Sequence, residues 1–189
     1  MKTGKKYIVM CVGHTHTGKT TFAKKLKKEI SNLVIIDNDD IGAFLNDKYS
    51  VAVLSPYNKV KRTFREPNFK FLISQDIFKF CLRAGLNVIH SSGNLGKDAR
   101  LLVKNNAKKY GYNFITIYFN LSKELIKERI TNTTKDTKSL WRSNNWLEVM
   151  EKQENYAELP PSKRGTIYFE IKNDNDYEKV FSEVRKTVE

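Results

Sequence analysis

The sequence contains few residues that could form a disulfide or bind zinc: two cysteines and three histidines among 189 residues. Their spacing matches no zinc motif. Cys11 lies in an apolar run and Cys81 in a helix-like stretch, so we expect two buried free thiols, as is usual in cytoplasmic proteins. No apolar segment approaches the roughly 20 residues that a transmembrane helix needs, so we expect no membrane span. These absences exclude a disulfide scaffold and a zinc domain.

Acidic residues are also scarce, because 21 of them stand against 34 lysines and arginines and leave a net charge of +13. This excess favours an anionic partner, such as a nucleotide, a nucleic acid or another phosphorylated molecule. The lysines are scattered along predicted helix faces, however, and form no single dense basic stripe. Nucleic-acid binding and a solvated lysine-rich surface therefore both remain explanations of the charge.

The most informative motif present is an eight-residue segment that begins with glycine and ends with Gly-Lys-Thr. Residues 13–20 read GHTHTGKT, which is the G-x-x-x-x-G-K-[ST] spacing of the phosphate-binding P-loop. In such a loop backbone N–H groups point at phosphate oxygens, the lysine lies between the outer phosphates and the threonine hydroxyl can ligate Mg²⁺. We expect Mg²⁺ at Thr20. The expected nucleotide-binding residues are Gly13, His14, Thr15, His16, Thr17, Gly18, Lys19, Thr20 and Thr21.

Apolar runs alternate with helical spacing along the chain. We expect strands at 7–12, 33–36, 86–89, 114–119 and 167–171. Helices are expected after the P-loop and at 67–84, 97–110, 144–157 and 177–188, with another that begins at Ser122 as its N-cap. This order predicts one domain, 1–189, built as an α/β/α sandwich of three layers on a five-stranded parallel sheet. The segment from about 131 to 161 is the only candidate for a movable lid.

An acidic run, Asp37-Asn38-Asp39-Asp40, directly follows the second strand. Ligands bind beyond the carboxyl ends of parallel strands, so this run and the P-loop should meet in one crevice. A carboxylate there could accept the proton of an attacking hydroxyl or hold the water shell of Mg²⁺; the alternative is the N-cap and first turn of a helix that starts near Asp40. After the third strand, where many P-loop proteins carry an aspartate, this chain has Ser91, which could bind Mg²⁺ through water.

Three arginines could supply the positive charge that a kinase places over a transferring phosphoryl group. Arg129 ends a predicted helix, Arg142 lies in the lid segment between Trp141 and Trp146, and Arg100 opens the helix after Asn94. The alternative for each is a solvated surface arginine. The two tryptophans could stack on a base or anchor the lid.

These motifs resemble those of the small P-loop kinases allied to phage polynucleotide kinase, zeta-toxin-like kinases, gluconate kinase and chloramphenicol phosphotransferase. The similarity covers most of the chain, from the P-loop to the last strand, and includes the segments 36–41, 87–100, 118–129 and 148–171. It implies a P-loop NTPase fold of the adenylate-kinase-like type with a small helical lid. In the second-strand motif of these kinases the residue that matches Asp39 is the general base.

The sequence departs from this pattern at two positions. Polynucleotide kinases carry an arginine three residues after the base, where this chain has Gly42, and the acidic end of the third strand is replaced by Ser91, as in gluconate kinases. The identity of the acceptor therefore stays open.

The resemblance implies an ATP- and Mg²⁺-dependent phosphotransferase that acts on a hydroxyl of a small metabolite or nucleoside. We expect Lys19, Asp39, Arg129 and Arg142 to be catalytic and Asp37, Asp40, Asn94 and Arg100 to lie on the acceptor side. One alternative is a polynucleotide 5′-hydroxyl kinase, which the charge favours and Gly42 disfavours. Another is an ATP-binding regulatory module; the sequence has no guanine-reading N-K-x-D run.

Overall fold

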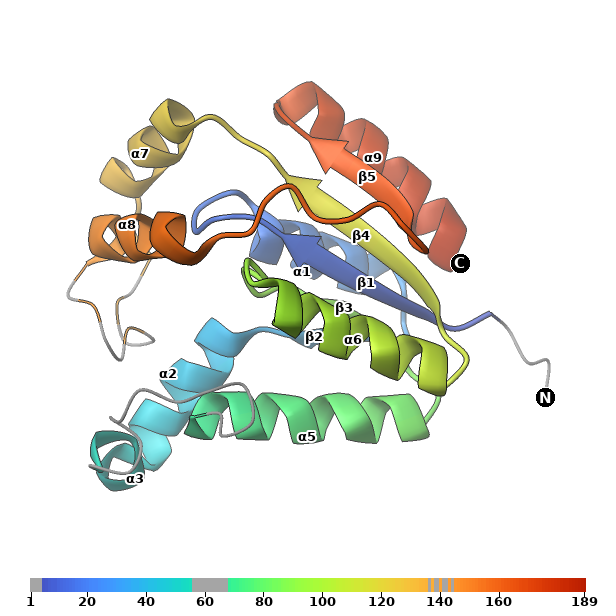
Figure 1. The fold of residues 1–189 in the computed structure, drawn as a ribbon, viewed down its shortest axis with the longest axis horizontal. Coiled ribbons are helices and arrows are strands. Elements are labelled where there is room, and N and C mark those ends of the chain that lie inside the picture. Colours follow the sequence, from blue (N-terminus) through green and yellow to red (C-terminus); the bar gives the residue numbers. More distant parts are fainter. Residues whose placement is uncertain (1–4, 56–67, 136, 138–139, 141–142, 144) are drawn as a thin grey trace.

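The computed structural model describes residues 5–55, 68–135, 137, 140, 143 and 145–189. Its five strands form one sheet in the order β2-β3-β1-β4-β5, and all neighbouring strands are parallel (Figure 1). The strands are β1 (Tyr7–Val12), β2 (Leu33–Ile36), β3 (Asn87–His90), β4 (Asn113–Phe119) and β5 (Ile167–Ile171). The predicted α/β fold with a five-stranded parallel sheet is therefore confirmed.

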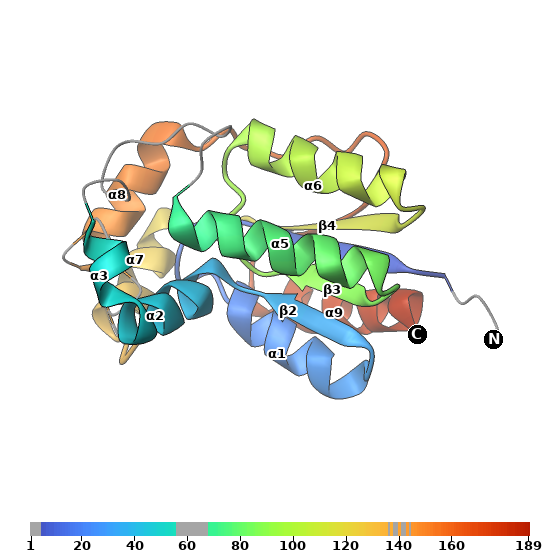
Figure 2. The same cartoon turned by 90° about the horizontal axis from the view of Figure 1, so that it is seen from below.

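Helices cover both faces of this sheet, as Figure 2 shows. Helices α1 (Lys19–Glu29) and α9 (Asp174–Val188) cover one face, and α5 (Phe69–Arg83) and α6 (Lys97–Lys109) cover the other. The remaining described helices lie beyond the carboxyl ends of the strands; they are α2 (Asn38–Lys48), α3 (Ser50–Leu54), α7 (Lys123–Thr131) and α8 (Trp146–Tyr156). None of the helices in the described ranges has the length and apolar character needed to cross a bilayer.

The central strand β1 is apolar throughout because both of its faces are buried. Alternate side chains point to opposite faces of a strand. Ile8, Met10 and Val12 accordingly pack in the core beneath α5 and α6. Tyr7, Val9 and Cys11 pack in the core beneath α1 and α9. The strand thus fixes the start of the P-loop in the middle of the sheet.

Side-chain caps decide where several helices begin. Ser122 caps α7 as predicted, because its Oγ accepts the N–H of Leu125 at 3.3 Å. Helix α2 begins at Asn38 rather than near Asp40, because the Asp37 carboxylate accepts the Asp39 N–H at 2.8 Å. Helix α9 begins at Asp174, three residues before the predicted start, because Asn173 caps it.

We predict that removal of the Phe22 ring strongly destabilises the fold. Phe22, on α1 directly after the P-loop, is fully buried and meets the rings of Phe119, Tyr177 and Phe181 edge-on at 5.4–5.9 Å between centroids. Phe22→Ala should lower the free energy of unfolding by about 3–5 kcal/mol in a denaturant titration. The exposed Lys28 on the same helix supplies the control: Lys28→Ala should change it by about 0.5 kcal/mol or less. An equal effect of the two variants would contradict this packing.

Candidate functional site

The loop between β1 and α1 takes a conformation that requires both of its glycines. Gly13 has φ +153°, and a Cβ there would lie 2.8 Å from the Phe119 carbonyl oxygen. Its N–H donates to the Gly93 carbonyl at 3.0 Å, which joins the loop to the segment after β3. Gly18 is in the left-handed region, at φ +96°, and forms the N-cap of α1. The loop therefore curls over the positive end of the helix, as phosphate binding requires.

The Lys19 side chain is buried inside this loop. Its ammonium group donates to the His14 carbonyl and to the Thr17 hydroxyl, the latter at 3.1 Å. Burial lowers the pKa of Lys19 to about 8, although the nearby carboxylates of Asp37 and Asp39 oppose that change. A cation of this kind can bind an anion at low cost, because its water shell has already been removed.

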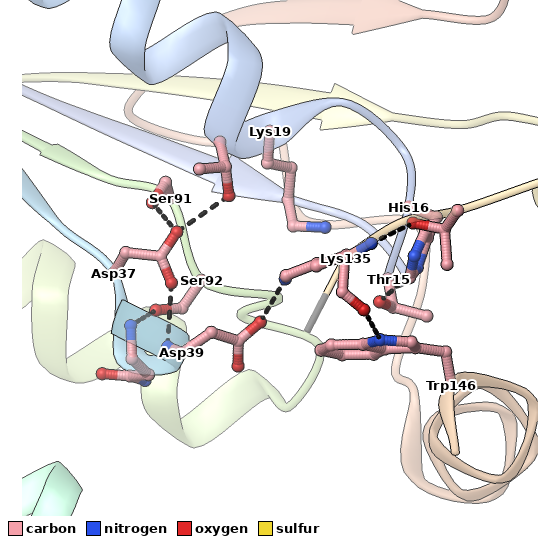
Figure 3. Close-up of polar contacts among 12 residues, drawn as sticks. Thr15, His16, Lys19, Asp37, Asp39, Ser91, Ser92, Lys135 and Trp146 are labelled. Carbon is pink, nitrogen blue, oxygen red and sulfur yellow. Dashed lines mark hydrogen bonds and ion pairs between the residues drawn. The ribbon is translucent and has the colours of Figure 1, made fainter. Parts of the chain in front are cut away.

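Asp37 is a buried carboxylate that joins three segments of the chain (Figure 3). One oxygen accepts hydrogen bonds from the hydroxyls of Thr20, at 2.8 Å, and Ser91, at 2.9 Å. The other accepts the Asp39 N–H. Burial raises the pKa of Asp37, but these three hydrogen bonds outweigh it and hold the pKa below its usual value. Asp37 thus lies against the P-loop threonine, whereas the sequence pattern placed it on the acceptor side.

The oxygen atoms around Asp37 fit a magnesium ion. Two hydroxyls and a carboxylate, from Thr20, Ser91 and Asp37, are the hard donors that Mg²⁺ prefers. Across the described part of the chain, no group of three or more histidine, cysteine, aspartate or glutamate residues could hold a metal. The donor set therefore suits a Mg²⁺ ion that takes its other ligands from phosphates and water.

Asp39 and Asp40 face a cleft of about 1320 Å³ that also includes the P-loop. The Asp39 carboxylate accepts a hydrogen bond from the Lys135 ammonium group at 2.9 Å. Burial, and next the Asp37 charge, raise the pKa of Asp40. The cleft continues between α5 and α6, where Phe71, Ser74 and Leu102 contribute to its wall.

Arg129 also lines this cleft, next to the P-loop. A Cβ on Gly18 would lie 3.9 Å from its guanidinium group. The same group forms an ion pair with Asp174 at 3.1 Å. Arg129 therefore lies beside the P-loop, with its guanidinium group held by Asp174. The other predicted catalytic arginine, Arg142, lies outside the described residues, as does Trp141.

Asn94 and Arg100, expected on the acceptor side, hold loops in place in this structure. The Asn94 amide donates to the carbonyls of Cys11, at 2.7 Å, and Ser92, at 2.9 Å. Arg100 donates to the carbonyls of Asn94 and Glu158, at 3.0 and 2.7 Å, and so joins the segment after β3 to the segment after α8. Asn94 lines the cleft, but Arg100 is not among the lining residues.

Helix α8 adds two contacts to the P-loop that no sequence motif indicates. Gln153 accepts the Thr15 N–H at 2.8 Å, and the buried ring of Trp146 meets the His16 ring edge-on at 5.1 Å between centroids. Trp146 also donates to the Lys135 carbonyl at 3.1 Å. Trp146 therefore joins the start of α8 to the P-loop and to the segment that contains Lys135. Lys135 and Gln153 were missed because nothing in their spacing separates them from the other polar residues of the chain.

Comparisons with known proteins agree with this geometry. A protein-family model described as an AAA domain matches residues 8–160. No curated protein sequence matches the chain.

Solved structures with the same fold include several kinases. A presumed kinase from Chloroflexus aurantiacus is 16% identical, with a TM-score of 0.69 over 98% of this chain and 100% of that one. A sugar kinase from Janibacter is 13% identical, with a TM-score of 0.61 over 96% and 93%. The Mycobacterium tuberculosis APS kinase, in complex with AMPPNP and APS, is 10% identical, with a TM-score of 0.58 over 96% of each chain. At these identities the likeness concerns the fold alone.

We predict that nucleotide binding takes up protons above neutral pH. Lys19 has a pKa of about 8, so a fraction of the protein molecules carries a neutral Lys19 above neutral pH. A bound phosphate would stabilise the ammonium form and raise this pKa. The uptake should be about half a proton at pH 8 and should be absent well below pH 7. Calorimetry in buffers of different ionisation enthalpy measures it. Lys19→Arg, which stays charged, should abolish the uptake, and an unchanged uptake in that variant would contradict the assignment.

Proposed function

Because this chain belongs to the AAA domain family, whose model covers most of its length, we propose that it is an ATP-dependent kinase that phosphorylates a hydroxyl group of a small acceptor. The observation that carries the proposal is the meeting of three groups at one cleft. They are the P-loop with Lys19, the buried carboxylate of Asp37 and the half-buried carboxylate of Asp39. A phosphate site next to a partly exposed carboxylate is the arrangement that phosphoryl transfer to a hydroxyl needs.

The donor half of the cleft would bind the nucleotide. The P-loop N–H groups and Lys19 would hold the β- and γ-phosphates, and Arg129 would approach them from α7. Thr20 and Asp37, with Ser91, would hold Mg²⁺, which neutralises phosphate charge when it is bound. Asp37 can serve there as a permanent anion, because its hydrogen bonds keep it ionised.

Asp39 would be the general base. It lies in the first turn of α2, and its side chain is 38% exposed at the cleft. The acceptor hydroxyl would give its proton to Asp39 as its oxygen forms a bond to the γ-phosphorus. The bond from that phosphorus to the β–γ bridging oxygen breaks, and ADP leaves with the electron pair.

The acceptor half of the cleft favours a small molecule. Its wall combines the Phe71 ring and the Leu102 side chain with the polar groups of Ser74 and Gln75. Such a surface can contact the carbon skeleton of a metabolite or nucleoside and hydrogen-bond to its hydroxyls. Among the described residues that line it, Arg129 is the one arginine, so this part of the wall contains no phosphate-binding pair of arginines.

A polynucleotide 5′-hydroxyl is the second candidate acceptor, and the net charge of +13 favours it. Lys24 and Lys70 line the cleft and could contact a phosphate backbone. Against it, Gly42 is buried in α2 at the position where polynucleotide kinases carry an arginine.

We predict that Asp39→Asn lowers the rate of phosphoryl transfer by about 10²–10⁴-fold, because the amide cannot accept the hydroxyl proton. Its affinity for ADP should stay within about twofold of the wild-type value. Asp47→Asn is the matched control: this exposed carboxylate is on the same helix, outside the cleft, and its loss should leave transfer unchanged. If the chain only binds nucleotide, neither variant will alter any measurable activity, and the kinase proposal fails.

We further predict that γ-labelled ATP transfers its label to small hydroxylated compounds or nucleosides in a screen that also contains 5′-hydroxyl oligonucleotides. For a small neutral acceptor, KM should change little between 50 and 200 mM salt. A polynucleotide acceptor would instead lose affinity steeply, by about a factor of ten or more, because its bound counterions are released. If affinity falls steeply with salt and the oligonucleotide becomes labelled, the acceptor is a polynucleotide and the small-acceptor proposal is wrong.

A further inference from the structure

Lys135, in the segment after α7, lies between the predicted base and an aromatic platform. Its ammonium group is 2.9 Å from an Asp39 carboxylate oxygen and 4.3 Å from the centroid of the Trp146 ring. The Trp146 ring is held in turn, because its N–H donates to the Lys135 carbonyl. Figure 3 shows Lys135 reaching from the Trp146 side of the site to Asp39. The contact therefore connects the lid segment to α2 across 96 residues of sequence.

The same ammonium group also faces the P-loop. Burial, and next the Lys135 charge, lower the pKa of His16 to about 4. The Lys135 charge also helps burial to lower the pKa of Lys19. Trp146 packs edge-on against His16, and Gln153 of the same helix bonds the Thr15 N–H. Lys135 is thus positioned by the helix that contacts the P-loop, close to the place where the outer phosphates of a nucleotide would lie.

The pair between Lys135 and Asp39 is one that a phosphate can break. Both side chains are partly exposed, at 41% and 38%, and pairs of this kind contribute little to stability. A terminal phosphate carries more negative charge than a carboxylate and offers three oxygens, so its bond with a lysine is the stronger one. The stacking on Trp146 limits the positions of the ammonium group, and so reduces the entropy lost when it changes partner.

We propose that Lys135 exchanges Asp39 for the γ-phosphate of the nucleotide, and that this exchange makes Asp39 available as the base. This inference rests on the proposed kinase function. While Lys135 donates to Asp39, it occupies an oxygen that would accept the acceptor proton. Once it contacts the γ-phosphoryl group, it stabilises the charge on the equatorial oxygens. Lys135 makes and breaks no covalent bond: the hydroxyl proton goes to Asp39 and the electron pair to the leaving oxygen of ADP.

The exchange can be tested by nucleotide binding alone, with AMP-PNP, which has a γ-phosphate, and ADP, which has none, each in the presence of Mg²⁺. Lys135→Met should weaken AMP-PNP binding by about tenfold or more in calorimetry and leave ADP binding within about twofold. Lys135→Arg should keep most of the AMP-PNP affinity. Lys127→Met, at an exposed lysine on α7, is the matched control and should change neither affinity.

Asp39→Asn gives the sharper result, because it removes the competing partner of Lys135. It should tighten AMP-PNP binding several-fold without altering ADP binding, and Lys135→Met in the same chain should cancel that gain. Asp40→Asn removes a nearby charge that interacts with Lys135 over a longer range but forms no ion pair with it. It should tighten AMP-PNP binding less than Asp39→Asn does, and most of that change should persist in the Lys135→Met background.

Two outcomes would overturn the exchange while leaving the kinase function intact. One is an equal loss of AMP-PNP and ADP affinity in Lys135→Met, which would show that Lys135 only supports the structure. The other is an unchanged ratio of the two affinities in Asp39→Asn. A wild-type protein that binds neither nucleotide would overturn the kinase function and the exchange together.

Discussion

The site depends on the hydrogen bonds that the buried carboxylate of Asp37 accepts. A buried charge is costly unless hydrogen bonds satisfy it, and Asp37 meets that need with the hydroxyls of Thr20 and Ser91 and with the Asp39 N–H. These donors belong to α1, to the segment after β3 and to α2. One side chain therefore sets the P-loop, the third strand and the predicted base at fixed positions relative to one another. Asp37 also follows the last residue of β2 and caps α2, so the same residue fixes a helix start in the fold and the geometry of the site.

Most of the fold could be predicted because its signals are local. The unbroken apolar run of β1 indicates a strand buried on both faces, and the paired glycines at 13 and 18 indicate the loop that follows it. Strand β5 occupies the predicted residues, and Ser122 caps the predicted helix. Helix starts were less certain, since Asp37 and Asn173 could equally have been loop residues; only the hydrogen bonds that they accept identify them as caps.

The roles of the polar residues around the cleft could not be predicted in the same way, because they depend on contacts between distant segments. Asp37 and Asp39 are two residues apart, yet one points to Thr20 and the other to Lys135. The sequence predicted a substrate contact for Arg100, but its guanidinium group donates to the backbone carbonyls of Asn94 and Glu158. Lys135 itself has no distinguishing pattern among the 34 lysines and arginines of the chain. Sequence motifs indicate the P-loop and the acidic run, whereas the contacts of Lys135 and Trp146 with them are seen only in the structure.

The positive charges of this chain fall into two groups, one on exposed helix faces and one at the cleft. Lysines on the outer helix faces, such as Lys27 and Lys28, are exposed to solvent, where salt screens them and they select no particular ligand. Lys19, Arg129 and Lys135 instead line one cleft, together with Asp37, Asp39 and Asp40. Arg129 and Lys135 are paired with carboxylates, so they can bind a phosphate chain strongly only if they leave those partners, whereas Lys19 donates to a carbonyl and a hydroxyl. Selectivity for a triphosphate would then come less from the total charge than from which ion pairs the incoming phosphates are able to replace.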